Sequence, residues 1–143
     1  MVKLIIKVDI FPTEDEDKVI RALSNLFDLD KMKSMEKEKN GIKTRVIIVG
    51  SLDMLNKLKN KIAMRQIQIH VRQQLINNRM GTMSHLYLNK QAAFANNINI
   101  CETRTESALG PIILEIHGDT EEDLDFVIYW LSEESKSPII DNI

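Results

Sequence analysis

The sequence lacks the residues needed for covalent crosslinks and the long apolar runs needed to enter a membrane. It has a single cysteine, Cys101, which excludes a disulfide within the chain and is typical of a reducing compartment. No apolar run approaches the ~18 residues that a membrane-spanning helix needs. The N-terminus alternates lysine with isoleucine and valine, unlike the apolar core of a signal peptide. These absences predict a cytoplasmic protein without a membrane partner.

Sequence signatures of catalysis and cofactor binding are also scarce. The five glycines are scattered singly, so the chain has no glycine-rich phosphate loop, and the three histidines lack the close spacing of zinc ligands. A metal site built from His85, Cys101 and His117 would require their strands to be neighbours. Cys101 fits a small buried residue better than a nucleophile, because no activating motif surrounds it. The sequence therefore predicts a non-enzymatic protein that uses neither a metal nor another cofactor.

The charged residues are segregated along the chain, although the net charge is only −2. Residues 1–53 carry ten basic and ten acidic side chains, whereas residues 54–101 carry seven basic side chains and no acid. Residues 102–143 carry eleven acids against two basic side chains. Such segregation is typical of a surface with one region suited to phosphate. The alternative is that the basic and acidic segments neutralise each other in the fold.

The N-terminal part of the chain predicts a strand followed by a helix. Polar and apolar residues alternate over 2–10, which indicates a half-solvated strand. The stretch that follows, Thr13-Glu14-Asp15-Glu16, is typical of a capping box, in which Thr13 caps the helix and Glu16 reaches back to the backbone. A weaker alternation over 31–39 then predicts a second strand.

Asn40-Gly41 predicts a tight hairpin turn into a strand over 42–50. Gly50-Ser51 ends that strand and is expected to cap a long helix, either continuous or broken near 63–66. Its expected buried face is apolar and recurs at helical spacing: Leu52, Leu55, Leu58, Ile62, Ile69 and Ile76.

The second half of the chain predicts three strands and a final helix. The strands are expected over 82–89, 98–100 and 112–117, with a short helical piece over 90–97. Thr120 with Asp123 opens the last helix. The order predicts an α+β domain over 1–131, with a mixed, largely antiparallel sheet that has helices on one face and the other face partly open. Residues 132–143 have the composition of a C-terminal tail.

The acid-free segment supplies the candidate residues for RNA binding. Phosphate recognition needs several cations without nearby carboxylates, and unpaired bases stack on accessible aromatic rings. Tyr87 is the candidate for stacking, with packing at a sheet edge as the alternative. Asn89 and Gln91 are candidates for bonds to bases or 2′-hydroxyls, with capping of a turn as the alternative. The candidate phosphate ligands are Lys57, Lys61, Arg65, Arg72, Arg79 and Lys90.

Three stretches carry a resemblance to a known family: "PTEDEDKV" after the first strand, "LYLNKQAAF" in the middle, and "LGPIILEI" near the end. They resemble an archaeal family described as RNA-binding and as a predicted exosome subunit. The resemblance spans nearly the whole chain and implies a fold similar to the large-subunit ribosomal protein that binds 5S rRNA. Its signature positions are Pro12, Thr13, Glu14, Asp15, Leu88, Asn89, Lys90, Gln91, Ala92, Ala93, Leu109, Gly110, Pro111 and Ile112.

Two hypotheses follow. The first is a protein that binds structured or single-stranded RNA through the basic helix and the Asn89-Lys90-Gln91 turn. The second is a protein-interaction module, or a homodimer, that docks on an RNA-processing assembly. Its support is the acidic C-terminal third and the apolar pair Ile139-Ile140 in the tail.

Overall fold

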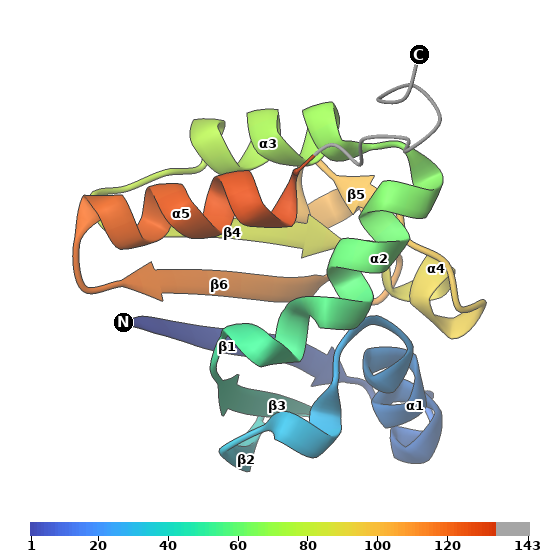
Figure 1. Ribbon diagram of the computed structural model, residues 1–143. Helices are drawn as coiled ribbons and strands as arrows, with labels where there is room; N and C mark the ends of the chain where they lie inside the picture. The colour runs from blue at the N-terminus through green and yellow to red at the C-terminus, as the bar shows by residue number, and fades with distance from the viewer. Residues whose placement is uncertain (134–143) are drawn as a thin grey trace.

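Strands with alternating side chains form one six-stranded sheet in the computed structural model, which describes residues 1–133 (Figure 1). The strand order is β2-β3-β1-β6-β4-β5, and all five pairings are antiparallel. The strands are β1 (Val2–Ile10), β2 (Ser34–Asn40), β3 (Lys43–Gly50), β4 (Met83–Leu88), β5 (Ile100–Cys101) and β6 (Ile112–Gly118).

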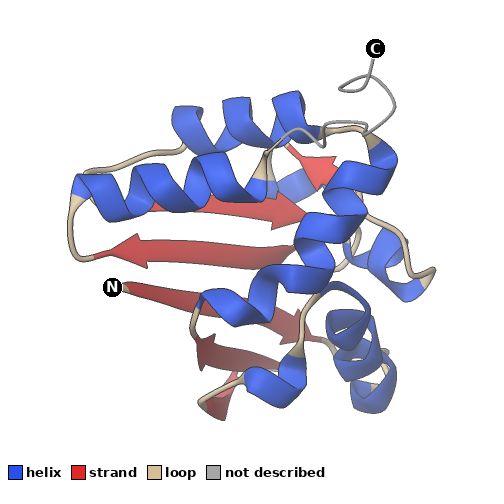
Figure 2. Ribbon diagram, in the orientation of Figure 1, coloured by secondary structure: helices blue, strands red, loops and turns tan. Residues whose placement is uncertain are grey.

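The α-helices cover one face of this sheet and leave the other face partly open (Figure 2). A 3-10 turn (Arg104–Glu106) lies against the open face beside Tyr87. α2, α3 and α5 lie across the face, and α1 contacts α4 at the end where β1 and β4 finish (Figure 1). The structure confirms the predicted α+β class with a largely antiparallel sheet. The helices are α1 (Glu16–Leu26), α2 (Asn56–Arg65), α3 (Gln68–Asn77), α4 (Lys90–Phe94) and α5 (Glu121–Leu131).

The period-two pattern of β1 separates the two faces. Leu4, Ile6 and Val8 are almost fully buried beneath the helices, while the residues between them are half-buried on the open face. Leu86 and Leu88 of β4 are buried on the covered face in the same way. A strand with one covered face needs this alternation, because successive side chains point to opposite sides of the sheet.

The predicted capping box at the start of α1 is wrong. The N-cap is Asp15, whose carboxylate accepts a hydrogen bond from the Asp17 backbone N–H. The Glu14 carboxylate turns back instead and accepts a hydrogen bond of 3.0 Å from the Phe11 backbone N–H. Thr13 therefore lies outside the helix, because the preceding turn takes two residues more than the capping motif predicts.

The long helix predicted after Gly50-Ser51 is two helices, in agreement with the expected break. Gln66 adopts a left-handed backbone conformation (φ 56°) between α2 and α3. Because this residue rotates the chain, the buried face of α3 consists of Val71 and Leu75. Ile69 and Ile76, predicted to be buried, are 62% and 47% exposed.

The start of this region also differs from the prediction. The Ser51 hydroxyl donates to the Asp53 carboxylate and makes no cap, and a 3-10 turn (Leu52–Leu55) precedes α2.

The last helix begins as predicted, since the Thr120 hydroxyl accepts a hydrogen bond from the Asp123 backbone N–H. The tail predicted over 132–143, with Ile139-Ile140, lies outside the described residues from 134 onward. Among the helices of residues 1–133, none has the length and apolar character needed to cross a membrane.

Candidate nucleic-acid interface

Lys90 is a buried structural cation, which revises its expected role as a phosphate ligand. Its side chain is fully buried, and its ammonium donates to the carbonyl oxygens of Asp9 (2.6 Å) and Leu109 (2.8 Å) and to the Glu14 carboxylate (3.1 Å). Burial lowers the pKa of Lys90, and the Glu14 carboxylate opposes that shift. We call this group of residues the Lys90 cluster; it leaves the ammonium inaccessible to an external phosphate.

The neighbours of Lys90 also serve the local fold. The Asn89 side chain accepts a hydrogen bond of 2.9 Å from the Ala92 backbone N–H and so caps α4. Gln91 is exposed, on the first turn of the same helix. Of the predicted Asn-Lys-Gln contact surface, only Gln91 is fully accessible to a ligand.

Arg72 of α3 and Arg79, which follows α3, are engaged with α5. Arg72 donates to the Ser132 hydroxyl (3.0 Å) and carbonyl (3.1 Å) at the C-terminal end of α5. Arg79 forms an ion pair with Asp125 on the same helix, and this pairing raises the pKa of its guanidinium. The Arg79–Asp125 pair corresponds to the alternative in which basic and acidic segments neutralise each other, whereas the partners of Arg72 are neutral groups of Ser132.

On a different surface, Lys57 and Lys61 take part in none of the described ion pairs, although the Asp28 carboxylate accepts a hydrogen bond from the Lys57 backbone N–H. Side chains from α1, α2 and the turn after α4 line a hollow of about 370 Å³, which we call the helix-side hollow. Lys61 donates to the Asn96 side chain (2.8 Å), and Lys57 donates to the Ser24 carbonyl (2.9 Å), so each ammonium keeps a further donor. Arg65 is exposed one turn beyond Lys61. The described lining contains no carboxylate: it consists of Ser24, Asn25, Lys57, Asn60, Lys61, Met64 and Asn96.

A second cationic depression lies on the open face of the sheet, where β1 and β3 meet the loop before β6. This sheet-face pocket measures about 190 Å³, and four cationic side chains and one carboxylate line it: Lys7, Lys43, Arg45, Arg104 and Asp9.

Asp9 organises the sheet-face pocket. It accepts hydrogen bonds from Arg45 (2.8 Å) and Lys43 (3.1 Å). Burial alone would raise the pKa of Asp9, but these two hydrogen bonds outweigh it and hold the pKa below its usual value. Lys7 pairs with Glu115 at 2.9 Å. The pocket therefore has an excess of positive charge that Asp9 inside it and Glu115 beside it do not cancel.

Tyr87 lies on the open face beside this pocket. Its ring is 4.9 Å from the His85 ring, and the Arg104 guanidinium lies 5.8 Å from its centre. Burial lowers the pKa of His85 and so favours the neutral imidazole. Tyr87 is half-buried and one strand from the edge, which resembles the packing at a sheet edge that was the alternative to stacking. Stacking on a base stays a prediction.

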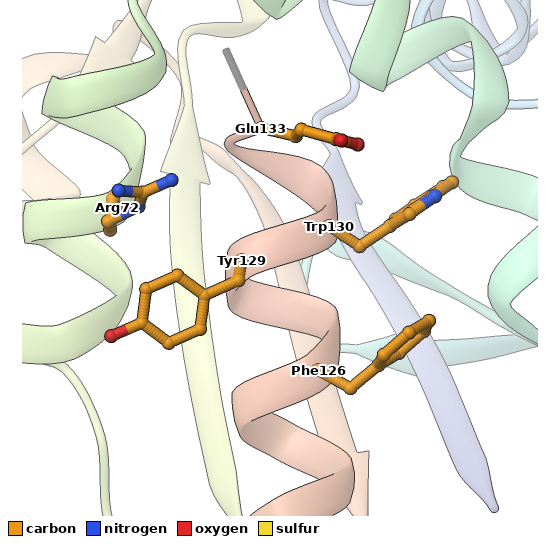
Figure 3. Close-up of a pocket in the computed structure, with 5 residues that line it drawn as sticks. All are labelled: Arg72, Phe126, Tyr129, Trp130 and Glu133. Carbon is orange, nitrogen blue, oxygen red and sulfur yellow. The ribbon is translucent and has the colours of Figure 1, made fainter.

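Exposed aromatic side chains gather on the outer surface of α5 (Figure 3). Phe126 and Tyr129 are 59% and 54% exposed. Arg72 lies 4.9 Å from the centre of the Tyr129 ring. They line a hollow of about 540 Å³, the aromatic hollow, together with Trp130 and Glu133. Within residues 1–133, no group of three or more His, Cys, Asp or Glu side chains could hold a metal ion.

The predicted residues thus divide among separate surfaces. Three of the cations, Lys57, Lys61 and Arg65, belong to α2. Arg72 of α3 and Arg79 after it contact α5, and Tyr87 lies on the open face of the sheet. Charge segregation along the chain missed the cations of the sheet-face pocket, because they lie in segments rich in acid. The alternation of β1 and β3 was the available signal, since it places these side chains on the open face: Lys7, Lys43 and Arg45.

Comparison with known proteins places the chain in a family. A family model described as RNA binding matches residues 3–118. A UPF0201 protein of Sulfurisphaera tokodaii is 36% identical over 134 residues, which cover 92% of this chain and 88% of the relative. The chain belongs to the UPF0201 family. A second UPF0201 protein, from Methanopyrus kandleri, is 32% identical and covers 93% of this chain and 86% of its own length.

A solved structure from the UPF0201 family has the same fold. The crystal structure of a UPF0201 protein from Methanococcus jannaschii matches with a TM-score of 0.77 at 27% identity, covering 91% of this chain and 98% of the other. The implied likeness to the 5S-rRNA-binding ribosomal protein stays a prediction.

The three stretches that carry the UPF0201 resemblance meet at the Lys90 cluster. The first supplies Glu14, the second supplies Lys90, and the third supplies the carbonyl of Leu109. Leu109 adopts a left-handed conformation (φ 61°), which is unfavourable for a branched side chain and accompanies its carbonyl's bond to the ammonium. These stretches therefore form a structural centre, and they do not by themselves define the surface that meets a ligand.

Proposed function

We propose that this protein is a cytoplasmic, non-enzymatic RNA-binding protein whose helix-side hollow contacts the backbone of structured RNA. One observation carries the proposal: Lys57 and Lys61 line a hollow that has no carboxylate among its described lining residues. Membership of a family described as RNA-binding supports the same ligand class.

The chemistry of the hollow suits a folded RNA backbone. Lysine ammonium groups bind phosphates as point charges, and asparagine side chains bond to 2′-hydroxyls, which distinguish RNA from DNA. Asn60 lies between the two lysines in sequence, on the same helix, and Asn96 already accepts a hydrogen bond from Lys61. Arg65 extends the cationic surface along α2.

Filter binding with a structured RNA across a salt series tests this proposal. Replacement of Lys57, Lys61 or Arg65 by alanine is expected to reduce the slope of log K against log salt by about one for each phosphate that is no longer bound. Lys37→Ala is the matched control, because it removes an exposed lysine from the edge strand β2. Absence of binding by the unaltered protein at low salt would contradict the proposal. So would a salt slope that is the same in the three α2 variants as in the Lys37→Ala control.

A second candidate function, self-association, is favoured by the exposed aromatic side chains of α5. A two-fold interface brings each surface against its own copy, so it must be self-complementary. The aromatic hollow meets that condition because Phe126 and Tyr129 lie beside both Arg72 and Glu133. We propose a homodimer through this surface; docking on an RNA-processing assembly stays a prediction.

Sedimentation equilibrium over a range of protein concentrations tests the homodimer. Phe126→Ala together with Tyr129→Ala is expected to give a monomer where the unaltered chain is dimeric, because aromatic anchors dominate interface energies. Ile42→Ala, which also trims an exposed apolar side chain, is the control. A monomeric unaltered chain at every concentration would remove this candidate and leave RNA binding untouched.

A further inference from the structure

We infer that the open face of the sheet is a binding site for single-stranded RNA, in which the sheet-face pocket holds a backbone phosphate and Tyr87 stacks on a base. This inference rests on the proposed RNA-binding function and deepens it, because it assigns a second surface and a different RNA structure to it. The site is separate from the helix-side hollow, which lies on the helical side of the molecule.

The pocket is built to hold an anion. Lys43 and Arg45 are held in place by Asp9, and their side chains remain 31% and 28% exposed. Each keeps donors beyond those that Asp9 accepts, because an ammonium has three N–H groups and a guanidinium has five. Arg104 comes from the opposite side, in the loop before β6, and is the third cation of the pocket. Unlike Lys43 and Arg45, it has no carboxylate partner among the described ion pairs.

Two carboxylates limit how much charge the pocket can accept. Asp9 cancels one cation, and Glu115 pairs with Lys7 at 2.9 Å. The remaining cationic groups suit one phosphodiester rather than a highly charged ligand. A single phosphate of an RNA strand, held by Lys43, Arg45 and Arg104, matches both this charge and the volume of about 190 Å³.

The sheet register connects this pocket to an aromatic surface. Tyr87 pairs with Ile113 on β6, and Ile113 pairs with Lys7 on β1, so all three lie in one row across the open face. Neighbouring strands lie about 4.8 Å apart, so two strand spacings, roughly 10 Å, separate Lys7 from Tyr87. Arg104 bridges the two parts, since it lines the pocket and its Nε donates to the Tyr87 hydroxyl at 3.3 Å.

The aromatic part suits an unpaired base. His85 and Tyr87 have ring centres 4.9 Å apart on one strand, and none of α1–α5 covers them. The nearest described turn on this face is the 3-10 turn Arg104–Glu106, whose Arg104 guanidinium lies 5.8 Å from the centre of the Tyr87 ring. Bases of single-stranded RNA stack on such rings without strong sequence preference. A double helix keeps its bases stacked inside, so the combination of phosphate pocket and aromatic surface selects a single strand.

Fluorescence anisotropy with a labelled oligouridylate tests the inference on the full-length chain. Arg104→Ala and Lys43→Ala are each expected to reduce the salt slope by about 0.7, the value for one phosphate contact to a single strand. Tyr87→Ala is expected to weaken binding roughly tenfold and leave the salt slope unchanged, because it removes stacking and no charge. Lys3→Ala is the matched control, since it removes an exposed lysine from the same face of β1 outside the pocket.

Photocrosslinking gives an independent readout. A strand containing 4-thiouridine is expected to crosslink to β4, and competition with polyglutamate should not remove the crosslink. If the sheet-face variants bind the oligouridylate like the unaltered protein, while Lys57→Ala and Lys61→Ala still weaken structured RNA, this inference is wrong and the proposed function stands. If polyglutamate competes as well as RNA, the pocket is a general anion site and the inference is overturned. If the unaltered protein binds neither RNA, both proposals fail.

Discussion

The Lys90 cluster and the sheet-face pocket use the same residue types side by side, with opposite consequences. Asp9 belongs to both: its carbonyl accepts from Lys90, while its carboxylate accepts from Lys43 and Arg45. Phe11 also touches both, with the ammonium of Lys90 at 5.7 Å and that of Lys43 at 5.8 Å from its ring. One cation is fully buried and satisfied by protein oxygens, whereas the others keep unused donors at the surface. The supply of local acceptors, and not the presence of a cation, decides which group is available to an external anion.

Replacing Lys90 is expected to have the largest effect, which is a loss of stability. Lys90→Met leaves the Glu14 carboxylate buried without its cation, and removing one partner of a buried ion pair costs about 3–5 kcal/mol of the free energy of unfolding. Urea unfolding followed by circular dichroism measures it. Lys61→Met, at a half-exposed position, is the control and should unfold close to the unaltered protein. A Lys90→Met variant of normal stability but weak RNA binding would reverse the roles assigned to the two regions.

Asn89 supports the Lys90 cluster through the cap of α4, and its loss is expected to be less severe. Asn89→Ala removes the hydrogen bond to the Ala92 backbone N–H and should lower the free energy of unfolding by about 1 kcal/mol. Asn89→Asp preserves the acceptor and is expected to retain most of the stability. If Asn89→Ala lost more RNA affinity than stability, Asn89 would be assigned a direct contact with RNA.

Removing the carboxylate of Asp9 is expected to change the sheet-face pocket and leave the Lys90 cluster as it is. Asp9→Asn takes away the negative charge that partly cancels Lys43 and Arg45, and a charge at about 4 Å in water is worth roughly a fivefold change in affinity. The oligouridylate is therefore expected to bind about fivefold more tightly. Lys90 should be unaffected, because it bonds to the Asp9 carbonyl, which the substitution retains. Weaker binding in this variant would count against an anion site.

Acid titration tests how much the Asp9 carboxylate contributes to stability. The pKa of Asp9 lies below its ordinary value in the folded chain, so its contribution to stability is present above about pH 4 and is lost as the pH falls through the folded pKa. Glu115 follows the same rule: burial would raise its pKa, but the Lys7 and His117 partners lower it. The free energy of unfolding, measured by urea titration at a series of acid pH values, should fall less steeply below pH 4 in Asp9→Asn. If the free energy of unfolding falls equally steeply in Asp9→Asn and in the unaltered protein, Asp9 contributes nothing to the loss of stability in acid.

The smallest effect is expected for Arg79. Its pair with Asp125 is at the surface, where ion pairs contribute little to stability, and its guanidinium is engaged with α5. Arg79→Ala should leave both the urea midpoint and the salt slope for RNA close to those of the unaltered protein. A reduced slope would mean that the turn after α3 contacts RNA after all.

The sequence predicted the helices and strands of this fold more successfully than the contacts between distant residues. The alternation of β1 and the cap at Thr120 are local patterns, and both were confirmed because neighbouring residues determine them. The burial of Ile69 was predicted wrongly, since the left-handed turn at Gln66 rotates α3 relative to α2. Lys90 shows the limit for the candidate site: its acceptors come from residues 9, 14 and 109, and no local pattern reports contacts so distant along the chain.

The edge strand β2 has a consequence for how copies of this protein behave in a crowded cell. Almost all of its residues are exposed, and Glu36, Lys37, Glu38 and Lys39 alternate in sign along it. Charged edges discourage strands of other molecules from pairing with the sheet, and the opposite edge, β5, is only two residues long. Both margins of the sheet are therefore protected against pairing with a strand of another molecule, so the sheet is not expected to grow by the addition of copies at its edges.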